Sequence, residues 1–257
     1  MIDATPFPVR AASCIPAVSA RQMAEVDRLA VDQFGIRVGQ MMELAGSHLA
    51  EVVRVELGGD LTGRRVVVTA GPGKNGGGGL VAARHLANGG ASVLTVLAAP
   101  VNRLDEIARH QVATLLEMST PCRVASYDVT GDEFARELAD ADAVVDAVLG
   151  YGAVGPPRAG VRWLVERIAR AAVPVVSLDL PSGIDADGEA AGDAVTAAAT
   201  VTLALPKRGL FSDRGRRGAG HVLLADIGLP AALYRLIGLD VGTPFALGPI
   251  VRLEVGA

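Results

Sequence analysis

Short apolar runs alternate with stretches of helical periodicity along most of this chain. The runs predict strands at residues 65–70, 92–98, 122–127, 143–149, 173–179, 199–205 and 220–225. Apolar residues at helical spacing predict helices near 78–88, 103–118, 132–139 and 159–171, between those strands. Because the strands are continuous apolar runs rather than alternating ones, they are typical of a parallel sheet covered on both faces. The pattern therefore predicts an α/β protein: a single-domain, three-layer α/β/α sandwich with a Rossmann-like, mostly parallel sheet.

The alternation is weaker at the two ends of the chain. Residues 1–18 are rich in proline and lack periodicity, which predicts a flexible N-terminal arm. Ser19 is a predicted N-cap for a first helix, and a second helix is predicted over 38–57. The predicted folded domain covers residues 19–240, and residues 241–257 form the predicted C-terminal tail.

A glycine-rich loop joins the first predicted strand to a helix. Residues 66–81 read VVVTAGPGKNGGGGLV, so an apolar strand stops in glycines and a helical pattern follows. This arrangement holds phosphate in α/β proteins, because glycine lets the backbone approach and the helix N-terminus offers free N–H groups. A standard dinucleotide clamp has an acid after its second strand, where this chain has Ala98-Ala99-Pro100, and no G-K-[ST] closes the loop. The loop predicts a phosphate site of another kind; a turn that serves chain geometry alone is the alternative.

Composition and charge narrow the possible functions. The chain has 257 residues, of which 50% are apolar and only 4% aromatic, and its formal net charge is −4. With no basic field and few rings for base stacking, a nucleic-acid partner is not expected. Two cysteines cannot build a disulfide framework, and no cysteine–histidine cluster suggests zinc. The chain shows no secretory signal pattern and no apolar stretch of about 20 residues, so we expect a cytoplasmic protein without a membrane partner.

Carboxylates stand at the ends of two other predicted strands. Asp146 lies in VVDAVLGYG and Asp179 in VVSLDLPSG, each shortly before a glycine turn. In open α/β sheets ligands bind at the carboxyl ends of the strands, and a carboxylate in apolar surroundings needs a partner or a cation. Each aspartate alone has a structural alternative, as an acceptor for loop N–H groups, but together they predict a site. Asn75, Asp146 and Ser182 offer hard oxygen ligands with one carboxylate, which suits a monovalent cation better than Ca²⁺ or Mg²⁺.

These motifs, in this order, resemble those of a known family, the NAD(P)H-hydrate epimerases or YjeF N-terminal domains. The loop from Gly71 to Leu80 resembles the family's G-P-G-N-N-G-G-D-G-L. The stretch from Asp146 to Gly155 resembles D-A-x-x-G-x-G, and Ser177 to Asp187 resembles S-x-D-x-P-S-G-x-D-x-D. Further matches are Gln22-Met23, Asp27, Gly35-Ile36, Met42-Glu43, Ala45-Gly46, Pro157-Arg158, Lys207, Gly209-Leu210 and Asp226 to Pro230. The resemblance covers residues 19 to 238.

The resemblance implies a function and a set of site residues. The family interconverts the R and S epimers of hydrated NADH and NADPH, which repairs a damaged metabolite; it is typically homodimeric and binds potassium. The resemblance implies that Asn75, Asp146 and Ser182 are the potassium ligands and that Asp179 faces the hydrated nicotinamide. The implied substrate-binding residues are Lys74, Asn75, Gly76, Gly77, Gly78, Gly150, Tyr151, Gly152, Ala153, Val154, Gly155, Pro156 and Asp179. Asp179 is our candidate catalytic residue, an acid and then a base that would protonate the departing C6 hydroxyl and deprotonate the returning water.

This chain departs from the family's loop at two positions. Lys74 stands where the family has its first asparagine, and Gly78 stands where it has an aspartate. Lys74 adds positive charge to a loop predicted to face phosphate, whereas Gly78 removes a group that can cap backbone N–H groups. Two functions are alternatives to the epimerase. One is that of a divergent relative that acts on or binds another nucleotide-like or biosynthetic small molecule, and the other is that of a non-catalytic binding or scaffold module. The retained Asp146, Asp179 and Ser182 favour the enzyme.

Overall fold

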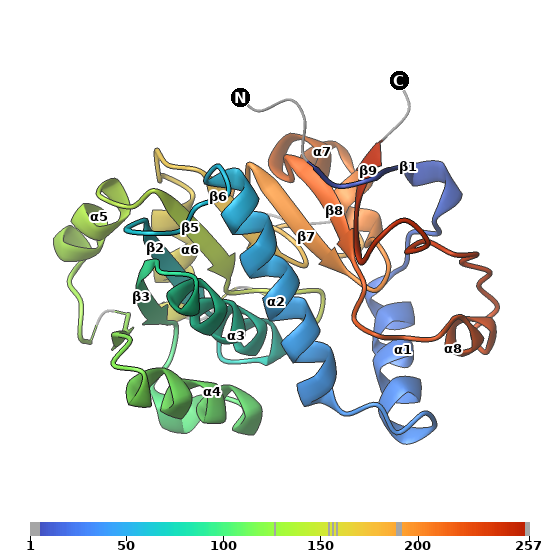
Figure 1. Ribbon diagram of the computed structural model, residues 1–257, viewed down its shortest axis with the longest axis horizontal. Helices are drawn as coiled ribbons and strands as arrows, with labels where there is room; N and C mark the ends of the chain where they lie inside the picture. The colour runs from blue at the N-terminus through green and yellow to red at the C-terminus, as the bar shows by residue number, and fades with distance from the viewer. Residues whose placement is uncertain are drawn as a thin grey trace.

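A nine-stranded sheet runs through the molecule, as the computed structural model shows for residues 6–125, 127–153, 155, 157, 159–188 and 192–254 (Figure 1). Its strands are β1 (Val9–Ala11), β2 (Arg65–Ala70), β3 (Ser92–Leu97), β4 (Cys122–Val124), β5 (Ala143–Ala147), β6 (Val175–Leu178), β7 (Ala199–Leu203), β8 (His221–Ala225) and β9 (Ile250–Glu254). They lie in the order β1-β9-β8-β7-β6-β5-β2-β3-β4. Neighbouring strands are parallel except β8 and β9, which are antiparallel. The predicted mostly parallel sheet is confirmed.

The strand order reverses between β2 and β5. From β2 the chain moves outward through β3 and β4, and it then returns to add β5, β6, β7 and β8 on the other side of β2. Val66 to Ala70 pair with Ala143 to Ala147 in parallel register, so β2 and β5 end side by side. A crevice forms at the carboxyl ends of strands where such a reversal occurs, because the connections leave the sheet in opposite directions.

Helices cover both faces of the sheet. The α-helices are α1 (Ala20–Asp32), α2 (Val38–Glu56), α3 (Lys74–Asn88), α4 (Glu106–Glu117), α5 (Gly131–Ala139), α6 (Ala159–Ile168), α7 (Asp213–Gly218) and α8 (Ala231–Arg235), and 3-10 helices span Ala12–Cys14, Val101–Arg103 and Arg208–Phe211. Val66 of β2 lies in one buried core with Leu49 of α2 and Leu80 of α3. Val67, on the opposite face of the same strand, lies in another core with Leu164 of α6. Alternate residues of one continuous apolar strand thus fill two cores, and the predicted three-layer sandwich is confirmed.

Helix α3 begins earlier than the sequence predicts. It begins at Lys74, so the glycine run lies within its first turns. Glycine is about 1 kcal/mol per residue less favourable than alanine in a helix, but these glycines permit very close packing. A Cβ on Gly79 would lie 2.4 Å from the Ala147 Cβ of β5, and a Cβ on Gly46 of α2 would lie 2.7 Å from the Gly78 carbonyl oxygen. Packing of α3 against the sheet and α2 therefore overrides the low helix propensity.

Segments near the two ends of the chain belong to the sheet. Within the predicted arm at 1–18, β1 pairs in parallel with β9, and Val18 forms a bridge to Lys207. Within the predicted tail at 241–257, β9 pairs with β8. The structure differs here from the expected flexible arm and tail, because backbone pairing with a distant strand holds these segments.

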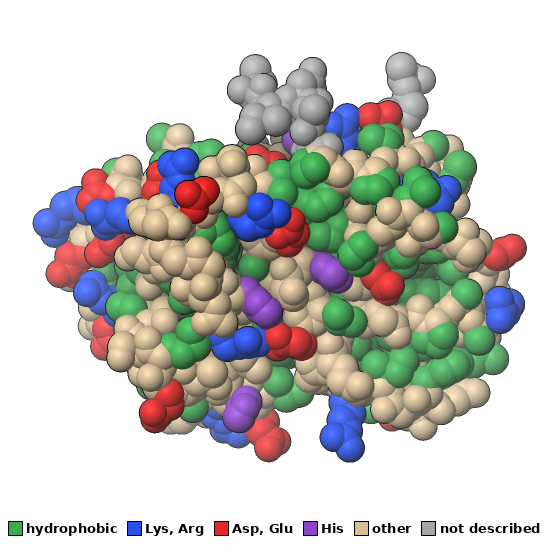
Figure 2. Space-filling view, viewed as in Figure 1, with side chains coloured by type: hydrophobic (Ala, Val, Ile, Leu, Met, Phe, Trp, Pro, Cys, Tyr) green, Lys and Arg blue, Asp and Glu red, His purple; other side chains and the backbone are tan. Residues whose placement is uncertain are grey.

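The surface fits the charge balance of the sequence. Figure 2 shows acidic and basic side chains interspersed over the face that it presents. Opposite charges mixed in this way create no extended field of one sign on that face. Among the described residues, no helix combines the length and the apolar character that a membrane crossing requires.

Candidate active site

A cavity of about 430 Å³ opens at the carboxyl ends of the central strands, where the strand order reverses. The part of its lining that comes from α1 and α2 is mainly apolar and includes Met23, Val38, Met41, Met42 and Ala45. The part that comes from α3 and the strand ends carries polar groups, among them Lys74, Asn75, Asp179 and Lys207. A mostly apolar cavity with a few placed polar groups is the usual form of a small-molecule site.

Glycine is required at two points in the turn between β2 and α3. A Cβ on Gly71 would lie 1.9 Å from the Val148 carbonyl oxygen, and a Cβ on Gly76 would lie 1.9 Å from the Gly71 carbonyl oxygen. The Gly71 N–H donates to the Ala147 carbonyl oxygen (3.0 Å), which joins the loops that follow β2 and β5. Because both contacts are with backbone, a side chain at either position displaces a loop. The turn brings the start of α3, with its free N–H groups, to the cavity.

Gly78, one of the two departures from the family's loop, has a packing partner in this chain. It lines the cavity, and a Cβ at this position would lie 2.7 Å from Cδ2 of the buried Leu178. The neighbouring Gly77 is equally close to α2, since its Cβ would lie 2.5 Å from Cε of Met42. An aspartate at position 78 therefore requires Leu178 to move.

Asp146 is fully buried at the end of β5 and is surrounded by donors. Its carboxylate accepts hydrogen bonds from Ser182 Oγ (2.6 Å), the Ser182 N–H (2.8 Å), Ser177 Oγ (2.9 Å) and the Val148 N–H (3.3 Å). Burial raises the pKa of Asp146, and the hydrogen bonds from Ser182 and Ser177 oppose that shift. Ser182 Oγ also accepts the Leu149 N–H (2.9 Å). Two predicted ligand residues, Asp146 and Ser182, are thus in direct contact, and they fix the backbone of two residues in the cavity lining.

Asn75, the third predicted ligand residue, lies in the first turn of α3 and lines the cavity. Its Nδ2 donates to the Leu178 carbonyl oxygen (3.3 Å). A Cβ on Gly150 would lie 3.2 Å from Asn75 Oδ1 and 3.2 Å from Asp179 Oδ2. Glycine at position 150 therefore leaves room for an amide oxygen and a carboxylate oxygen beside the same turn.

Asp179 and Lys207 form a buried ion pair at the ends of the neighbouring strands β6 and β7. Asp179 is 3% exposed and Lys207 is 0% exposed. The Lys207 Nζ contacts Asp179 Oδ1 and donates to the Leu203 carbonyl oxygen (2.8 Å). Asp179 Oδ2 accepts the Tyr151 N–H (2.9 Å). Buried charges are stable when they are paired and hydrogen-bonded, so this arrangement keeps two opposite charges in the lining of a mostly apolar cavity.

The same uncommon turn follows both of these strands. Asp179 has φ +69° and Ala204 has φ +63°, in the left-handed region. Across each of them, the N–H of the following residue donates to the carbonyl oxygen of the preceding one (2.9 and 2.7 Å). A hydrogen bond across a single residue with positive φ is the mark of a γ-turn, which is strained and rare. The two turns reverse the chain sharply, and they bring Asp179 and Lys207 together from different strands.

Asp27, Tyr151 and Lys74 form a second polar group in the cavity lining. The Tyr151 hydroxyl donates to Asp27 Oδ2 (2.7 Å), and the Lys74 Nζ lies 3.7 Å from the same oxygen. Burial, and then the negative charge of Asp27, raises the pKa of Tyr151, so its hydroxyl stays protonated. The Lys74 side chain is 56% exposed. Lys74, which stands where the family's loop has an asparagine, thus has an ion-pair partner on α1 and remains accessible to a ligand.

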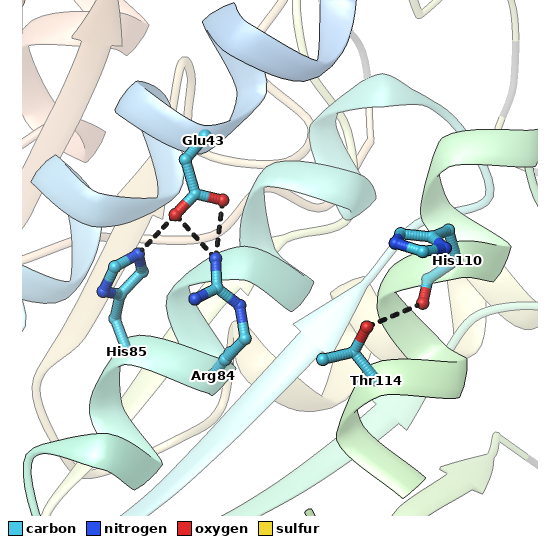
Figure 3. Close-up of polar contacts among 5 residues, drawn as sticks. All are labelled: Glu43, Arg84, His85, His110 and Thr114. Carbon is cyan, nitrogen blue, oxygen red and sulfur yellow. Dashed lines mark hydrogen bonds and ion pairs between the residues drawn. The ribbon is translucent and has the colours of Figure 1, made fainter. Parts of the chain in front are cut away.

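A surface cluster joins α2 to α3. Figure 3 shows Glu43 facing Arg84 and His85, while His110 and Thr114 lie apart on α4. Arg84 Nη2 donates to both Glu43 oxygens (2.5 and 2.6 Å), and His85 Nε2 lies 2.8 Å from Oε1. Partial burial raises the pKa of Glu43, but the hydrogen bonds from Arg84 and His85 outweigh burial, and the net result is a lowered pKa. The cluster helps to hold α3, whose start borders the cavity.

Glu43→Gln is expected to lower the free energy of unfolding at pH 7 by up to about 1 kcal/mol, and to have little effect near pH 3. Because the folded-state pKa lies below the ordinary value of 4.5, the ionised carboxylate stabilises the fold above pH 4.5. This contribution is lost as the pH falls through the folded-state pKa. Thermal unfolding between pH 3 and 8 checks the result, with Glu117→Gln at the exposed end of α4 as the control. A difference in Tm that does not change with pH would contradict it.

The structure brings most of the predicted substrate-binding residues to the cavity. Its lining includes Lys74, Asn75, Gly78, Gly150, Tyr151, Gly152, Ala153 and Asp179. Gly76 and Gly77 are buried in the first turn of α3, and Gly155 follows in the loop with φ +75°. Val154 and Pro156 lie outside the described residues. The roles of all these residues toward a substrate stay predictions.

Sequence reasoning assigned no role to Lys207 or to Asp27, although both belong to matching motifs. A usable signal existed for Lys207, since it follows the apolar strand β7 much as Asp179 follows β6. For Asp27 the signal was weak, because a single acid on an amphipathic helix is ordinarily a solvated residue. Its contact with Tyr151 depends on how α1 packs beside the loop that follows β5.

The fold and the cavity together define a doubly wound α/β protein with a ligand site at the switch point of its sheet. Comparison with known families gives the assignment. The chain belongs to the family described as YjeF-related protein N-terminus, which matches residues 38–209. The family predicted from the motifs is confirmed.

Individual relatives agree with this assignment. The chain is 40% identical over 238 residues to a protein named NAD(P)H-hydrate epimerase from Dehalogenimonas lykanthroporepellens, and the match covers 91% of this chain and 90% of that protein. It is 37% identical over 227 residues to a protein from Salinibacter ruber named bifunctional NAD(P)H-hydrate repair enzyme Nnr, of which the match spans 42%. The crystal structure of the yeast protein ynu0 (YNL200c) has a TM-score of 0.80 and 27% identity, and the match covers 93% of this chain and 100% of that one.

Proposed function

We propose that this chain is an NAD(P)H-hydrate epimerase, an isomerase that interconverts the R and S epimers of hydrated NADH and NADPH. Relatives with that name are 40% and 38% identical to it over most of its length. The observation that carries the proposal is the cavity that joins the start of α3 to the buried carboxylate of Asp179. It supplies a phosphate-binding element and a charged group within reach of one dinucleotide.

The lining of the cavity suits the different parts of this substrate. The free N–H groups at the start of α3 and the accessible ammonium of Lys74 suit the pyrophosphate. The apolar side chains of Met41 and Met42 suit the face of a partly reduced ring. Gly150 to Ala153 contact the dinucleotide in this proposal, and Asp179 then faces the hydrated nicotinamide.

The reaction inverts one carbon, C6 of the hydrated ring. The hydroxyl on C6 gains a proton and leaves as water, while the electron pair of N1 forms a C6=N1 double bond that carries a positive charge. Water then adds to the other face of C6 and releases a proton. Asp179 is the proposed catalytic residue, because its carboxylate stabilises the cationic ring in a cavity with few competing polar groups.

Asn75, Asp146 and Ser182 would hold a potassium ion. Their oxygens are hard ligands with a single negative charge, which fits a monovalent ion. The Nδ2 of Asn75 is bonded to a carbonyl, which leaves its Oδ1 beside Gly150 as a ligand. Among the described residues, no group of three or more His, Cys, Asp or Glu side chains is placed to hold a metal ion. When bound, the ion supplies positive charge next to the phosphate-binding turn.

Asn75→Ala is expected to raise the potassium concentration for half-maximal activity by roughly 10–100-fold. One ligand is lost, whereas the core stays intact because Asn75 is only half-buried at the start of α3. Epimerisation rates are measured against KCl concentration, with tetramethylammonium chloride keeping the ionic strength constant. Asn102→Ala, on the exposed 3-10 helix Val101–Arg103, is the control. An unchanged potassium dependence in Asn75→Ala would remove this residue from the ion site.

The activity itself is tested with the pure S epimer of hydrated NADPH, protein and potassium. NMR or chromatography follows the appearance of the R epimer. The expected rate is far above the spontaneous one. A rate equal to the spontaneous one would contradict the epimerase, and it would direct the search to another phosphorylated ligand of a divergent relative.

A homodimer and a cytoplasmic location complete the proposal. Membership of the family supports both. Size-exclusion chromatography with light scattering tests the first, because a dimer has twice the chain mass of 26.3 kDa. Fractionation of the source cells tests the second.

A further inference from the structure

Lys207 is a buried lysine in the lining of the cavity, and its surroundings engage only part of its hydrogen-bonding capacity. An ammonium group has three N–H donors. One donates to the Leu203 carbonyl oxygen (2.8 Å), and the charged Nζ is ion-paired with Asp179 Oδ1. The Nζ also lies 5.8 Å from the centroid of the Tyr151 ring, within the range of a cation–π contact. Among the described residues the Nζ donates no other hydrogen bond, and Lys207 belongs to the lining of the cavity.

The other titratable groups near Lys207 are less suited to supply a proton. From the end of β6, Asp179 uses one oxygen for the Tyr151 N–H and the other for Lys207. From the loop after β5, Tyr151 donates its hydroxyl to Asp27 of α1, and that carboxylate also pairs with Lys74 of α3. Burial raises the pKa of Tyr151, which keeps its proton in place. Lys207 thus combines a proton with a place in the lining of the cavity.

We propose that Lys207, and not Asp179, carries the proton in the epimerisation, and that Asp179 is the counter-ion of the cationic ring; this assignment rests on the proposed function. Lys207 gives one proton to the C6 hydroxyl, the C6–O bond breaks, and water leaves. The N1 electron pair forms the C6=N1 bond. The lysine becomes a neutral amine and the ring becomes a cation. Nothing is oxidised or reduced.

The charge of the buried site stays constant throughout this step. Before it, the site holds the Lys207 cation and the Asp179 anion beside a neutral ring. After it, the ring holds the positive charge beside the same anion. Because a low-dielectric cavity penalises any net charge, moving one positive charge by a short distance is more favourable than creating a new one.

The return step uses the same residue. The ring turns about its bond to the ribose, so that its opposite face meets the amine. Water adds to C6 on that face, the C6=N1 electrons return to N1, and Lys207 accepts the proton from the added water. The hydroxyl has then changed faces, and the ion pair of Lys207 and Asp179 is restored.

Lys207→Arg separates proton transfer from charge. The guanidinium keeps a positive charge beside Asp179 but does not give up its proton. We expect kcat to fall by about 10²–10⁴-fold while KM changes little. Arg208→Ala, at the exposed neighbouring cation, is the control. If Lys207→Arg retains the parent kcat to within about tenfold, Lys207 is only a positioning residue for Asp179, and the proposal is overturned.

Chemical rescue provides a test that does not depend on one variant folding well. In Lys207→Ala, added methylamine is expected to restore turnover, whereas guanidinium of the same charge is not. Restoration by both compounds, or by neither, overturns the proposal. The parent rate is measured first: a parent protein without activity overturns the epimerase and this role together, whereas an active parent with an active arginine variant overturns the role of Lys207 alone.

Discussion

Replacing Asp179 with asparagine is expected to lower kcat for epimerisation by about 10²–10⁴-fold. Asparagine keeps the shape of the side chain and can still accept the Tyr151 N–H, but it has no charge to offset the cationic ring. It also leaves the ammonium of Lys207 buried without an ionic partner, which is expected to lower the free energy of unfolding by about 3–5 kcal/mol. Steady-state kinetics and urea unfolding measure the two effects separately.

A double variant, Asp179→Asn with Lys207→Met, distinguishes the chemistry from the stability. Without the ammonium there is no unpaired buried charge, so the free energy of unfolding is expected to return toward that of the parent protein. Turnover is expected to stay lost, because neither the counter-ion nor the proton carrier is present. Recovery of activity together with stability would show that the ion pair only supports the fold.

Gly71→Ala is expected to lower the free energy of unfolding by about 3–5 kcal/mol, a loss similar to that expected for Asp179→Asn. The new Cβ would lie 1.9 Å from the Val148 carbonyl oxygen, and that atom belongs to the backbone, which cannot rotate away as a side chain can. The loops after β2 and β5 must therefore separate. Urea unfolding and the dinucleotide affinity are both expected to report the change.

Gly73→Ala is the matched control in the same turn. A Cβ on Gly73 would meet no described heavy atom within 4 Å, so the free energy of unfolding is expected to stay within about 0.5 kcal/mol of the parent value. Equal losses in Gly71→Ala and Gly73→Ala would mean that the backbone freedom of glycine matters here, and not the close approach of the two loops.

The fold could be predicted from the sequence wherever a strand is recognisable from its own apolar residues. The run Val66-Val67-Val68 is apolar because both faces of β2 are buried, and such a run shows itself without knowledge of its neighbours. β1 has only three residues, Val9–Ala11, and none of them is buried, so its place in the sheet depends on pairing with the backbone of β9. The start of α3 was missed because the propensity of glycine opposes a helix, and the close packing against Ala147 of the sheet and against α2 explains why the helix forms.

Part of the site could also be predicted from the sequence, namely its two buried aspartates. Asp146 and Asp179 stood out because a carboxylate among valines and leucines is costly unless it has partners. The partners themselves depend on geometry that the sequence does not contain. Lys207 reaches Asp179 only because β6 and β7 are neighbours and because Ala204, a residue without a preference for positive φ, adopts a γ-turn.

The position of β1 has a consequence for the synthesis of this protein. β1 lies beside β9, although almost the whole chain separates the two strands in sequence. A ribosome adds roughly 5–20 residues per second, so residues 9–11 emerge tens of seconds before residues 250–254. During that time β1 has no partner, and once β8 has emerged its edge stays open to other polypeptides until β9 pairs with it. The nascent chain is therefore most prone to aggregation, and most in need of a chaperone, just before its last strand emerges.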